Sequence, residues 1–418
     1  MADRRADNEQ NNPRNLYAFG LTSFFNDTAS EMAYWVLPAF LASIGAGPAQ
    51  LGVIEGIAES VASLAKLFSG YLADRWSRRK PLVVSGYVVA NAVKPLLALV
   101  TSWWQVLGIR FVDRFAKGVR GTARDVMVAE SVTGDRMGSA YGLIQAMDSA
   151  GAIAGPLLAL WILARGGGMR SVFWTAAIPG SLCVLVALLG IRETARASSH
   201  RNSSSRAELR DEHRDLSSSS PVTAALPSVS TRTHLSRGFY YVLLVVTLFS
   251  LGNSSDMFLV LRAESVGIPV SLAPLLGLVF NLTYTLAAWP AGRLSDRMSR
   301  RKVAALGYLV FGLVYFAFAM GTSRTLIWAA MAFYGLFYAL TAPVLKALVV
   351  ETVAPEVRGR ALGVYFSVTS VAALLASVIT GELWKLYGPL LPFCLSAGAA
   401  VVSAALLLSW RSAVNSRS

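Results

Sequence analysis

The sequence predicts an all-α membrane protein in which twelve transmembrane helices form two bundles of six. Three observations predict this fold class. Hydrophobic residues make up 54% of the 418 positions and charged residues only 15%, a balance typical of helical membrane proteins. Apolar stretches long enough to cross the ~30 Å hydrocarbon layer recur along the chain. The first half of the chain also recurs, in diverged form, as the second half.

The apolar stretches predict helices at residues 16–43, 49–73, 81–101, 103–131, 138–163 and 170–191, and then at 238–262, 271–295, 303–321, 325–352, 359–384 and 388–410. Uncharged loops at 45–50 and 101–104 end the first and third helices. Loops rich in Arg and Lys, at 75–80, 297–302 and 358–360, end the second, eighth and tenth.

These helices divide the chain into an N-terminal six-helix bundle at 16–191 and a C-terminal six-helix bundle at 238–410. Residues 192–237, rich in Ser, Arg and acidic residues with little apolar periodicity, predict a disordered cytoplasmic linker. This linker is interpreted as a flexible tether, and a regulatory or docking role is the alternative. Residues 1–15 and 411–418 are expected to be cytoplasmic tails.

The net charge of +14 does not indicate nucleic-acid binding, because the basic residues gather in alternate loops. That asymmetry follows the positive-inside rule, which predicts a multi-pass protein of the cell (inner) membrane with both termini in the cytoplasm. The protein is expected to meet lipid, protons and a small-molecule substrate.

Cysteine and histidine exclude several kinds of site. Cys183 and Cys394 lie in different apolar spans without C-x-x-C spacing, so neither a disulfide framework nor a thiolate metal site is expected. All three histidines, His200, His213 and His234, fall in the polar linker. No metal or other cofactor is predicted, and an intramembrane proton carrier must therefore be a carboxylate.

A charged segment occurs twice. Residues 70–80 read GYLADRWSRRK, and residues 292–302 read GRLSDRMSRRK, 222 positions later. We interpret both copies as a cytoplasmic latch, in which aspartates stabilise helix N-termini of the other half and arginines bridge across. Charges that only orient membrane insertion are the alternative. The latch residues are Gly70, Asp74, Arg75, Arg78, Gly292, Asp296, Arg297 and Arg300.

These two segments resemble the loop motif G-x-L-x-D-R-x-x-R-R-K of the major facilitator superfamily, and the resemblance extends from Leu16 to about Trp410. It implies two parallel halves with a substrate site between them near the membrane midplane. The resemblance also implies that the latch stabilises an outward-facing state. A further repeat relates Glu31 on the first helix to Asp256 on the seventh.

The fourth helix carries a charged stripe within an arc of about 140°. Its members are Arg110, Asp113, Arg114, Lys117, Arg120, Arg124 and Asp125. Ionised groups at bilayer depth cost at least ~2.5 kcal/mol each, so this face must meet water or partners rather than lipid. Carboxylates on neighbouring helices supply such partners. For Glu55 and Glu59 on the second helix, pairing with the fourth-helix cations is favoured over proton binding.

Residues 114–118 resemble the family motif R-x-x-Q-G, with Lys117 in place of glutamine, and the resemblance implies that Arg114 assists proton transfer. Lys117 indicates either an anionic substrate or another ion pair, while Arg120, Arg124 and Asp125 are favoured as snorkelling or latch residues. We expect a proton switch in which Asp27 or Glu31 exchanges partners with Arg110 or Arg114. The proton-coupling candidates are Asp27, Glu31, Arg114, Glu59 and Asp148.

The substrate-binding candidates come from helices that line the central cavity in this family: Arg110, Lys117, Asn26, Asp256, Asn253 and Lys346. Tyr334 and Tyr338 are expected as aromatic cavity walls or as packing residues. On the fifth helix, Gly151, Gly155 and Pro156 resemble the G-x-x-x-G-P motif of antiporters. They are expected to pack this helix tightly against the eighth, with ordinary helix packing as the alternative.

By resemblance, the chain is expected to be a secondary active transporter that moves a small organic solute by alternating access, as a monomer. Proton-coupled efflux is favoured by the fifth-helix motif. Import of an organic anion with protons is the alternative, favoured by the cationic stripe, and a membrane sensor or lipid flippase would use the same fold. An enzyme is not expected, because no nucleophile triad, phosphate loop or metal cluster is present.

Overall fold

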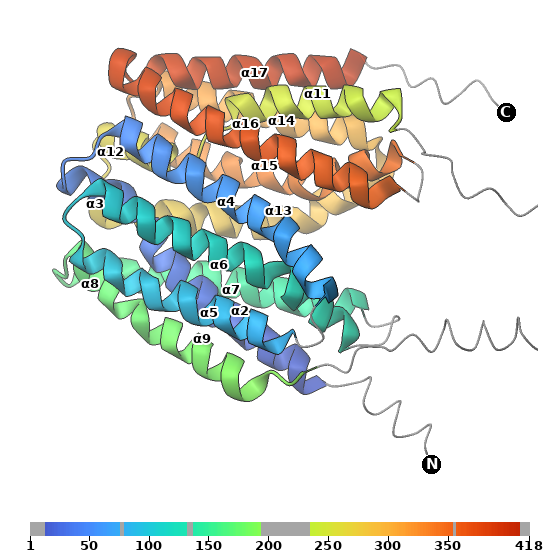
Figure 1. The fold of residues 1–418 in the computed structure, drawn as a ribbon. Helices are drawn as coiled ribbons and strands as arrows, with labels where there is room; N and C mark the ends of the chain where they lie inside the picture. The colour runs from blue at the N-terminus through green and yellow to red at the C-terminus, as the bar shows by residue number, and fades with distance from the viewer. Residues whose placement is uncertain (1–12, 76–78, 132–136, 194–234, 354–356, 410–418) are drawn as a thin grey trace, which may run out of the picture.

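The computed structural model describes residues 13–75, 79–131, 137–193, 235–353 and 357–409, and these residues are almost entirely helical. The helices form two bundles of nearly parallel and antiparallel rods that lie side by side (Figure 1). The predicted all-α, two-bundle fold class is confirmed. The start of α2 and the end of α17 lie at the same end of the molecule in Figure 1.

The N-terminal bundle contains α2 (Pro13–Tyr34), α3 (Leu37–Ser43), α4 (Pro48–Arg75), α5 (Lys80–Val93), the 3₁₀ turn η1 (Lys94–Leu99), α6 (Trp103–Glu130), α7 (Met137–Ala164), α8 (Met169–Thr175) and α9 (Ala177–Gly190). The predicted first, third and sixth helices are each interrupted. Prolines lie at or just after these interruptions, at Pro38, Pro95 and Pro179, and a proline removes a helical N–H donor and disfavours helix in the residue before it.

The C-terminal bundle contains α11 (Arg237–Gly252), α12 (Met257–Ser265), the 3₁₀ turn η3 (Val270–Leu272), α13 (Ala273–Arg297), α14 (Arg300–Met320), α15 (Arg324–Glu351), α16 (Arg358–Tyr387) and α17 (Leu390–Ser409). The predicted seventh helix is therefore split into α11 and α12. The four residues of the split, Asn253, Ser254, Ser255 and Asp256, are all polar.

Nine helical stretches in the described part of the chain are long and apolar enough to cross a membrane. They correspond to all the predicted spans except the first, second and fourth. Those three are represented by α2, α4 and α6, which carry the acidic and basic residues predicted to form the site. The intramembrane charges that single out these helices also lower their hydropathy, and the count of twelve spans stays a prediction.

The two bundles meet along two seams. In the first, glycines of α4 and α16 bring the backbones together: Gly52 lies against Ser377, and Gly381 lies against Pro48. Ser60 Oγ also donates a hydrogen bond of 2.9 Å to the carbonyl of Ser370. Small residues at a seam allow this close approach.

The second seam joins α2 and α7 to α13. The amide of Asn281 donates to the carbonyl of Ala152 at 3.2 Å. The indole of Trp35 fills the space that a side chain at Gly277 would occupy. Trp35 is only 2% exposed, so its ring is fully part of the contact between the bundles.

The repeated charged segments lie at the ends of α4 and α13. Gly70, Asp74 and Arg75 end α4, and Gly292, Asp296 and Arg297 end α13; of these, only Arg297 has a described side chain, and it is exposed. Arg78 lies outside the described residues. The latch role stays a prediction.

In each bundle, an arginine of the charged segment forms an ion pair with a glutamate of the same half. Arg79 contacts Glu130 at 2.5 Å in the N-terminal bundle. Arg300 contacts Glu351 at 2.6 Å in the C-terminal bundle. Glu130 and Glu351 are equivalent positions of the duplication. These two pairs are internal to their own halves, so they brace each bundle separately.

Gly151 and Gly155 of α7 face α2, and not α13 as expected from the sequence. A methyl group on Gly155 would lie 2.7 Å from the carbonyl oxygen of Thr28 and 2.8 Å from Cβ of Glu31. The contact of α7 with α13 runs instead through neighbouring positions such as Ala152. The two glycines therefore fix the position of the helix that carries Asp27 and Glu31, and Pro156 follows them within α7.

We predict that Gly155→Ala lowers the free energy of unfolding by about 1–3 kcal/mol, because the added methyl overlaps backbone atoms of α2. The matched control is Gly142→Ala on the same helix, where the described atoms leave the space open. It should be neutral or stabilising by up to about 1 kcal/mol, since alanine favours helix. Denaturant titration of the purified protein checks both, and equal effects would contradict this packing.

Candidate functional site

The charged stripe of α6 is held first by an ion pair to α4. Arg110 donates from Nε to Glu55 Oε1 at 3.0 Å and from its terminal nitrogen to the same oxygen at 2.6 Å. Both residues are buried, with Glu55 1% and Arg110 7% exposed. A buried pair of this kind is retained only when its geometry is good, because removing one partner leaves an uncompensated charge. The predicted pairing of the second and fourth helices is confirmed.

A second pair lies one turn along the same two helices. Arg114 approaches Glu59 Oε1 at 3.7 Å. Unlike Glu55, the side chain of Glu59 is 53% exposed. The side chain of Glu59 therefore contacts Arg114 and is at the same time exposed.

The remaining stripe residues turn toward α5 and α2. Asp113 lies 3.8 Å from Lys94 Nζ, which also donates to Asn91 Oδ1 at 3.1 Å. The guanidinium of Arg120 lies over the ring of Tyr87, 4.5 Å from its centroid. The opposite face of α6 exposes Trp104, Phe111 and Phe115. The stripe therefore faces protein and cavities, as its cost in lipid requires.

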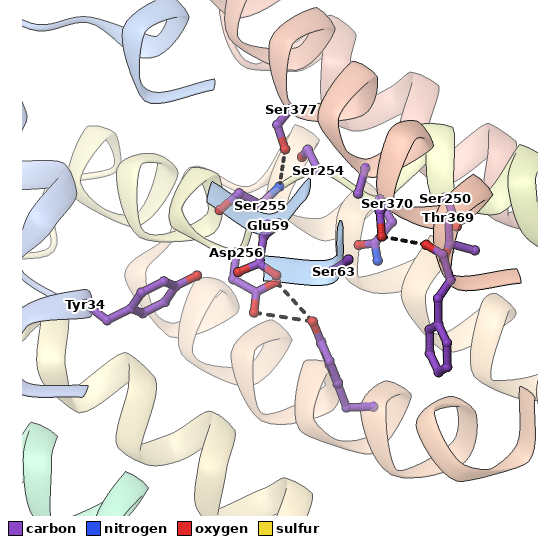
Figure 2. A pocket seen from close by; sticks show the side chains of 14 residues that line it. Tyr34, Glu59, Ser63, Ser250, Ser254, Ser255, Asp256, Thr369, Ser370 and Ser377 are labelled. Atoms are coloured by element: carbon purple, nitrogen blue, oxygen red, sulfur yellow. Dashed lines mark hydrogen bonds between the residues drawn. The ribbon is translucent and has the colours of Figure 1, made fainter. Parts of the chain in front are cut away.

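A cavity of about 340 Å³ lies between the two bundles; we call it the central cavity (Figure 2). The N-terminal bundle contributes Tyr34, Glu59 and Ser63 to it. The C-terminal bundle contributes Ser250, Asn253, Ser254, Ser255, Asp256, Tyr338, Phe366, Thr369, Ser370, Ala373 and Ser377. The split between α11 and α12 thus opens directly onto this cavity.

Asp256 is the acidic residue of that split. Its carboxylate accepts a hydrogen bond of 2.5 Å from Tyr334 and contacts the Tyr338 hydroxyl at 3.4 Å. Both tyrosines belong to α15. Because the backbone of residues 253–256 is not helical, the side chain of Asp256 is placed by these phenols and by the start of α12. Figure 2 shows it beside Glu59 of the other bundle.

A second cavity of about 180 Å³ lies within the N-terminal bundle; we call it the N-bundle cavity. It is lined by Ser23, Asn26, Asp27, Lys66, Tyr87, Lys117, Arg120, Gly121, Arg124, Asp125 and Asp148. Asn26 donates to Asp27 Oδ1 at 2.9 Å, and Arg124 contacts Ser23 and Asp125, each at 3.1 Å. Among the described residues, one buried oxygen of Asp148 has no hydrogen-bond partner.

The predicted proton-coupling residues therefore do not share one cavity. Asp27 and Asp148 line the N-bundle cavity, while Glu59 lines the central cavity and pairs with Arg114. Glu31 lies elsewhere on α2 and accepts a hydrogen bond of 2.7 Å from Trp35 Nε1. In this conformation Arg110 and Arg114 pair with acids of α4 rather than with Asp27 or Glu31, and the predicted exchange of partners stays a prediction.

The predicted substrate-binding residues also separate into two groups. Asn253 and Asp256 line the central cavity, whereas Asn26 and Lys117 line the N-bundle cavity. Arg110 belongs to neither group, because it forms an ion pair with Glu55. The side chain of Lys346 lies outside the described part of the chain, although its backbone belongs to α15.

Sequence reasoning missed several residues that the structure brings to the site. Lys94 is the only basic residue in the predicted third helix. A single charge in an otherwise apolar helix indicates that the charge has a partner on a neighbouring helix. The hydroxyl-rich lining from α16, including Thr369, Ser370 and Ser377, carried no motif. Residues of this kind are recognised only when the bundles are seen together.

Several known proteins are similar to this chain in sequence. The sequence model described as Major Facilitator Superfamily matches residues 19–261 and 242–418. A protein of Methanocaldococcus jannaschii described as an uncharacterized MFS-type transporter is 31% identical over 413 residues, 96% of each chain. Multidrug resistance protein MdtG of Serratia proteamaculans is 23% identical over 405 residues, 95% of this chain and 93% of the relative.

Solved structures share the fold. The nucleoside transporter NupG superposes with a TM-score of 0.72 at 14% identity, covering 95% of this chain and 99% of the other. A D-xylose–proton symporter superposes with a TM-score of 0.70 at 15% identity, covering 96% and 97%. At these identities the likeness concerns the fold alone.

We predict that the two α4–α6 ion pairs differ sharply in their effect on stability. Glu55→Gln should lower the free energy of unfolding by about 3–5 kcal/mol, because Arg110 stays buried without its counter-charge. Glu59→Gln should cost less than about 1 kcal/mol, because exposed pairs contribute little. Denaturant titrations measure both. In the double variant with Arg110→Gln the losses should fall short of the sum of the single losses, and simple additivity would contradict the pairing.

Proposed function

The chain belongs to the Major Facilitator Superfamily, and on that premise we propose that this membrane transporter exports a small organic solute in exchange for protons. We further propose alternating access between the two bundles, with both termini on the cytoplasmic side of the inner membrane. The observation that carries the proposal is the pair of acids, Asp27 and Asp148, that share the N-bundle cavity with the cations of α6.

Proton coupling follows from the chemistry of that cavity. One buried oxygen of Asp148 has no hydrogen-bond partner among the described residues, and a proton or a movable cation would satisfy it. Lys117 and Arg124 line the same cavity and supply such cations. A carboxylate that loses its cationic partner in a nonpolar environment binds a proton more readily. A movement of α6 relative to α2 and α7 would therefore change proton occupancy.

The coupling must also reach the solute. Glu59 lines the central cavity and pairs with Arg114 on α6, three residues before Lys117. Substrate entering the central cavity meets the exposed part of Glu59 and perturbs that pair. Because α6 is one rigid helix, a change at Arg114 is transmitted to Lys117. This is the route by which we propose that solute and proton compete.

Two observations support the outward direction. Gly151 and Gly155, part of the antiporter-like motif, pack α7 directly on the segment of α2 that bears Asp27 and Glu31. The similarity to a multidrug resistance protein over 95% of the chain also favours efflux. The packing suits an exporter because it keeps the acids of α2 and α7 at a fixed separation.

Uptake of an organic anion together with protons is the second candidate function. It is favoured by the lining of the N-bundle cavity, where four basic residues, Lys66, Lys117, Arg120 and Arg124, meet three acidic ones. However, Arg110, Arg114, Arg120 and Arg124 of the stripe have carboxylate or aromatic partners in the structure. Efflux is therefore the better supported reading.

Reconstitution into liposomes with an imposed pH gradient tests the proposal. Purified protein is challenged with a panel of organic cations, neutral solutes and organic anions while an enclosed dye reports pH. Solute movement opposite to the proton gradient, accompanied by dissipation of that gradient, is expected for an antiporter. Accumulation of an anion along the gradient would instead identify a symporter.

We predict that Asp27→Asn and Asp148→Asn each reduce gradient-driven transport at least about a hundredfold, the lower end of the usual scale for a positioned proton-transfer group. Solute exchange without a gradient should persist, because the amides keep the shape of the cavity. Glu382→Gln serves as control, since this exposed acid of α16 lines neither cavity. Full gradient-driven transport in the Asp27→Asn/Asp148→Asn double variant would overturn the coupling mechanism.

A further inference from the structure

The central cavity has a consistent electrostatic character. Among its described lining residues there are two carboxylates, Glu59 and Asp256, and no lysine or arginine. The cations of the neighbouring α6 stripe lie behind this lining rather than in it. A water-accessible hollow with low-dielectric walls and one sign of charge concentrates ions of the opposite sign.

The two carboxylates are not equally compensated. Glu59 has Arg114 at 3.7 Å on its far side. Asp256 is held by the hydroxyls of Tyr334 and Tyr338, which donate hydrogen bonds but carry no charge. Asp256 is thus the acid in this cavity whose described partners leave it without a counter-ion.

The neutral groups of the lining present acceptors. Thr369 and Ser370 donate their hydroxyl protons to backbone carbonyls of α16, at 2.8 Å and 2.6 Å, so their oxygens are left as acceptors. Buried Asn253 Oδ1 has no hydrogen-bond partner among the described residues. Buried oxygens without partners carry a cost that a donor-rich ligand removes.

We propose that the solute of the central cavity is a small organic cation rich in hydrogen-bond donors, a primary amine whose ammonium group meets Asp256. An ammonium supplies three donors and a positive charge, which matches the acceptor oxygens and the uncompensated acid. The volume of about 340 Å³ is at the lower end for small-molecule sites, so the solute is compact. This inference deepens the proposed transport function: that the bound molecule is also the transported solute rests on that proposal.

The charge of the cavity can be measured without knowing the ligand. Ser63→Cys, in a protein with Cys183→Ala and Cys394→Ala, places one thiol in the central cavity. Its rates of reaction with the cationic trimethylammonioethyl and the anionic sulfonatoethyl methanethiosulfonates are each divided by the rate with a small free thiol. We expect the cationic reagent to be favoured about tenfold or more, and Asp256→Asn to abolish most of that preference.

Gly121→Cys provides the matched control in the N-bundle cavity. A Cβ there meets only Lys66 Cε, at 3.8 Å, so the substitution fits. That cavity carries more basic than acidic residues, and its thiol should show no preference for the cationic reagent. Should the ammonium of Lys346 dominate the central cavity, the anionic reagent would react faster at Ser63→Cys. That result, or equal normalised rates, would overturn the inference.

Binding to the purified full-length protein tests the ligand class with probes matched in shape. Glucosamine, glucose and glucuronate share one ring and differ in charge. The linear probes 1,4-diaminobutane, 1,4-butanediol and succinate share a four-carbon chain and differ in charge in the same way. Calorimetry should show that at least one amine binds ten or more times tighter than its neutral and anionic matches, and that Asp256→Asn removes this difference. Tightest binding by an anion or a neutral probe, or no binding by either amine, overturns the inference.

These readouts separate the inference from the transport proposal. Amine binding without proton exchange in liposomes would contradict the proposed antiport while supporting the ligand class. Proton-driven export of neutral or anionic solutes, together with a central cavity that shows no cation preference, would do the reverse.

Discussion

The constraint on which this structure depends is that ionised side chains inside a bilayer-spanning bundle must be given partners. The α6 stripe carries seven charges, and the described neighbours meet them in different ways. Glu55 and Glu59 on α4 pair with Arg110 and Arg114, Lys94 approaches Asp113, and the ring of Tyr87 receives Arg120. The N-terminal bundle is assembled around these contacts, and the remaining charges of the stripe line a small cavity. Polar contacts of such cost are kept where they serve a function.

The duplication has produced two halves with different chemistry. The N-terminal half lines its own cavity with both signs of charge, whereas the C-terminal half contributes hydroxyls and one acid, Asp256, to the central cavity. Glu31 and Asp256 occupy equivalent positions of the repeat, and in both halves an aromatic side chain donates to the acid: Trp35 in one, Tyr334 in the other. The same scaffold position was therefore adapted in one half to the interface between bundles and in the other to the central cavity.

The sequence predicted the fold class, the order of the helices and their approximate bounds, because long apolar stretches and repeated charged loops leave few alternatives. It did not predict the interruptions near Trp35, Lys94 and Ala176, since a bend inside an apolar run changes composition very little. The pairing of Glu55 and Glu59 with α6 followed from helical periodicity. The separation of the site into two cavities did not follow from periodicity, because it depends on how α5, α11 and α16 pack. The sequence also does not show that most cations of α6 already have carboxylate or aromatic partners in the folded chain.

The seam between the halves limits how the two halves can diverge in evolution. The indole of Trp35 takes the space beside Gly277 on α13 while donating a hydrogen bond to Glu31. Any larger residue at 277 collides with that ring, and any smaller residue at 35 leaves a void. The two halves descend from one repeated sequence, yet at this point neither is free to drift alone. A chimaera that joins the first half of this chain to the second half of a relative would need both positions to travel together.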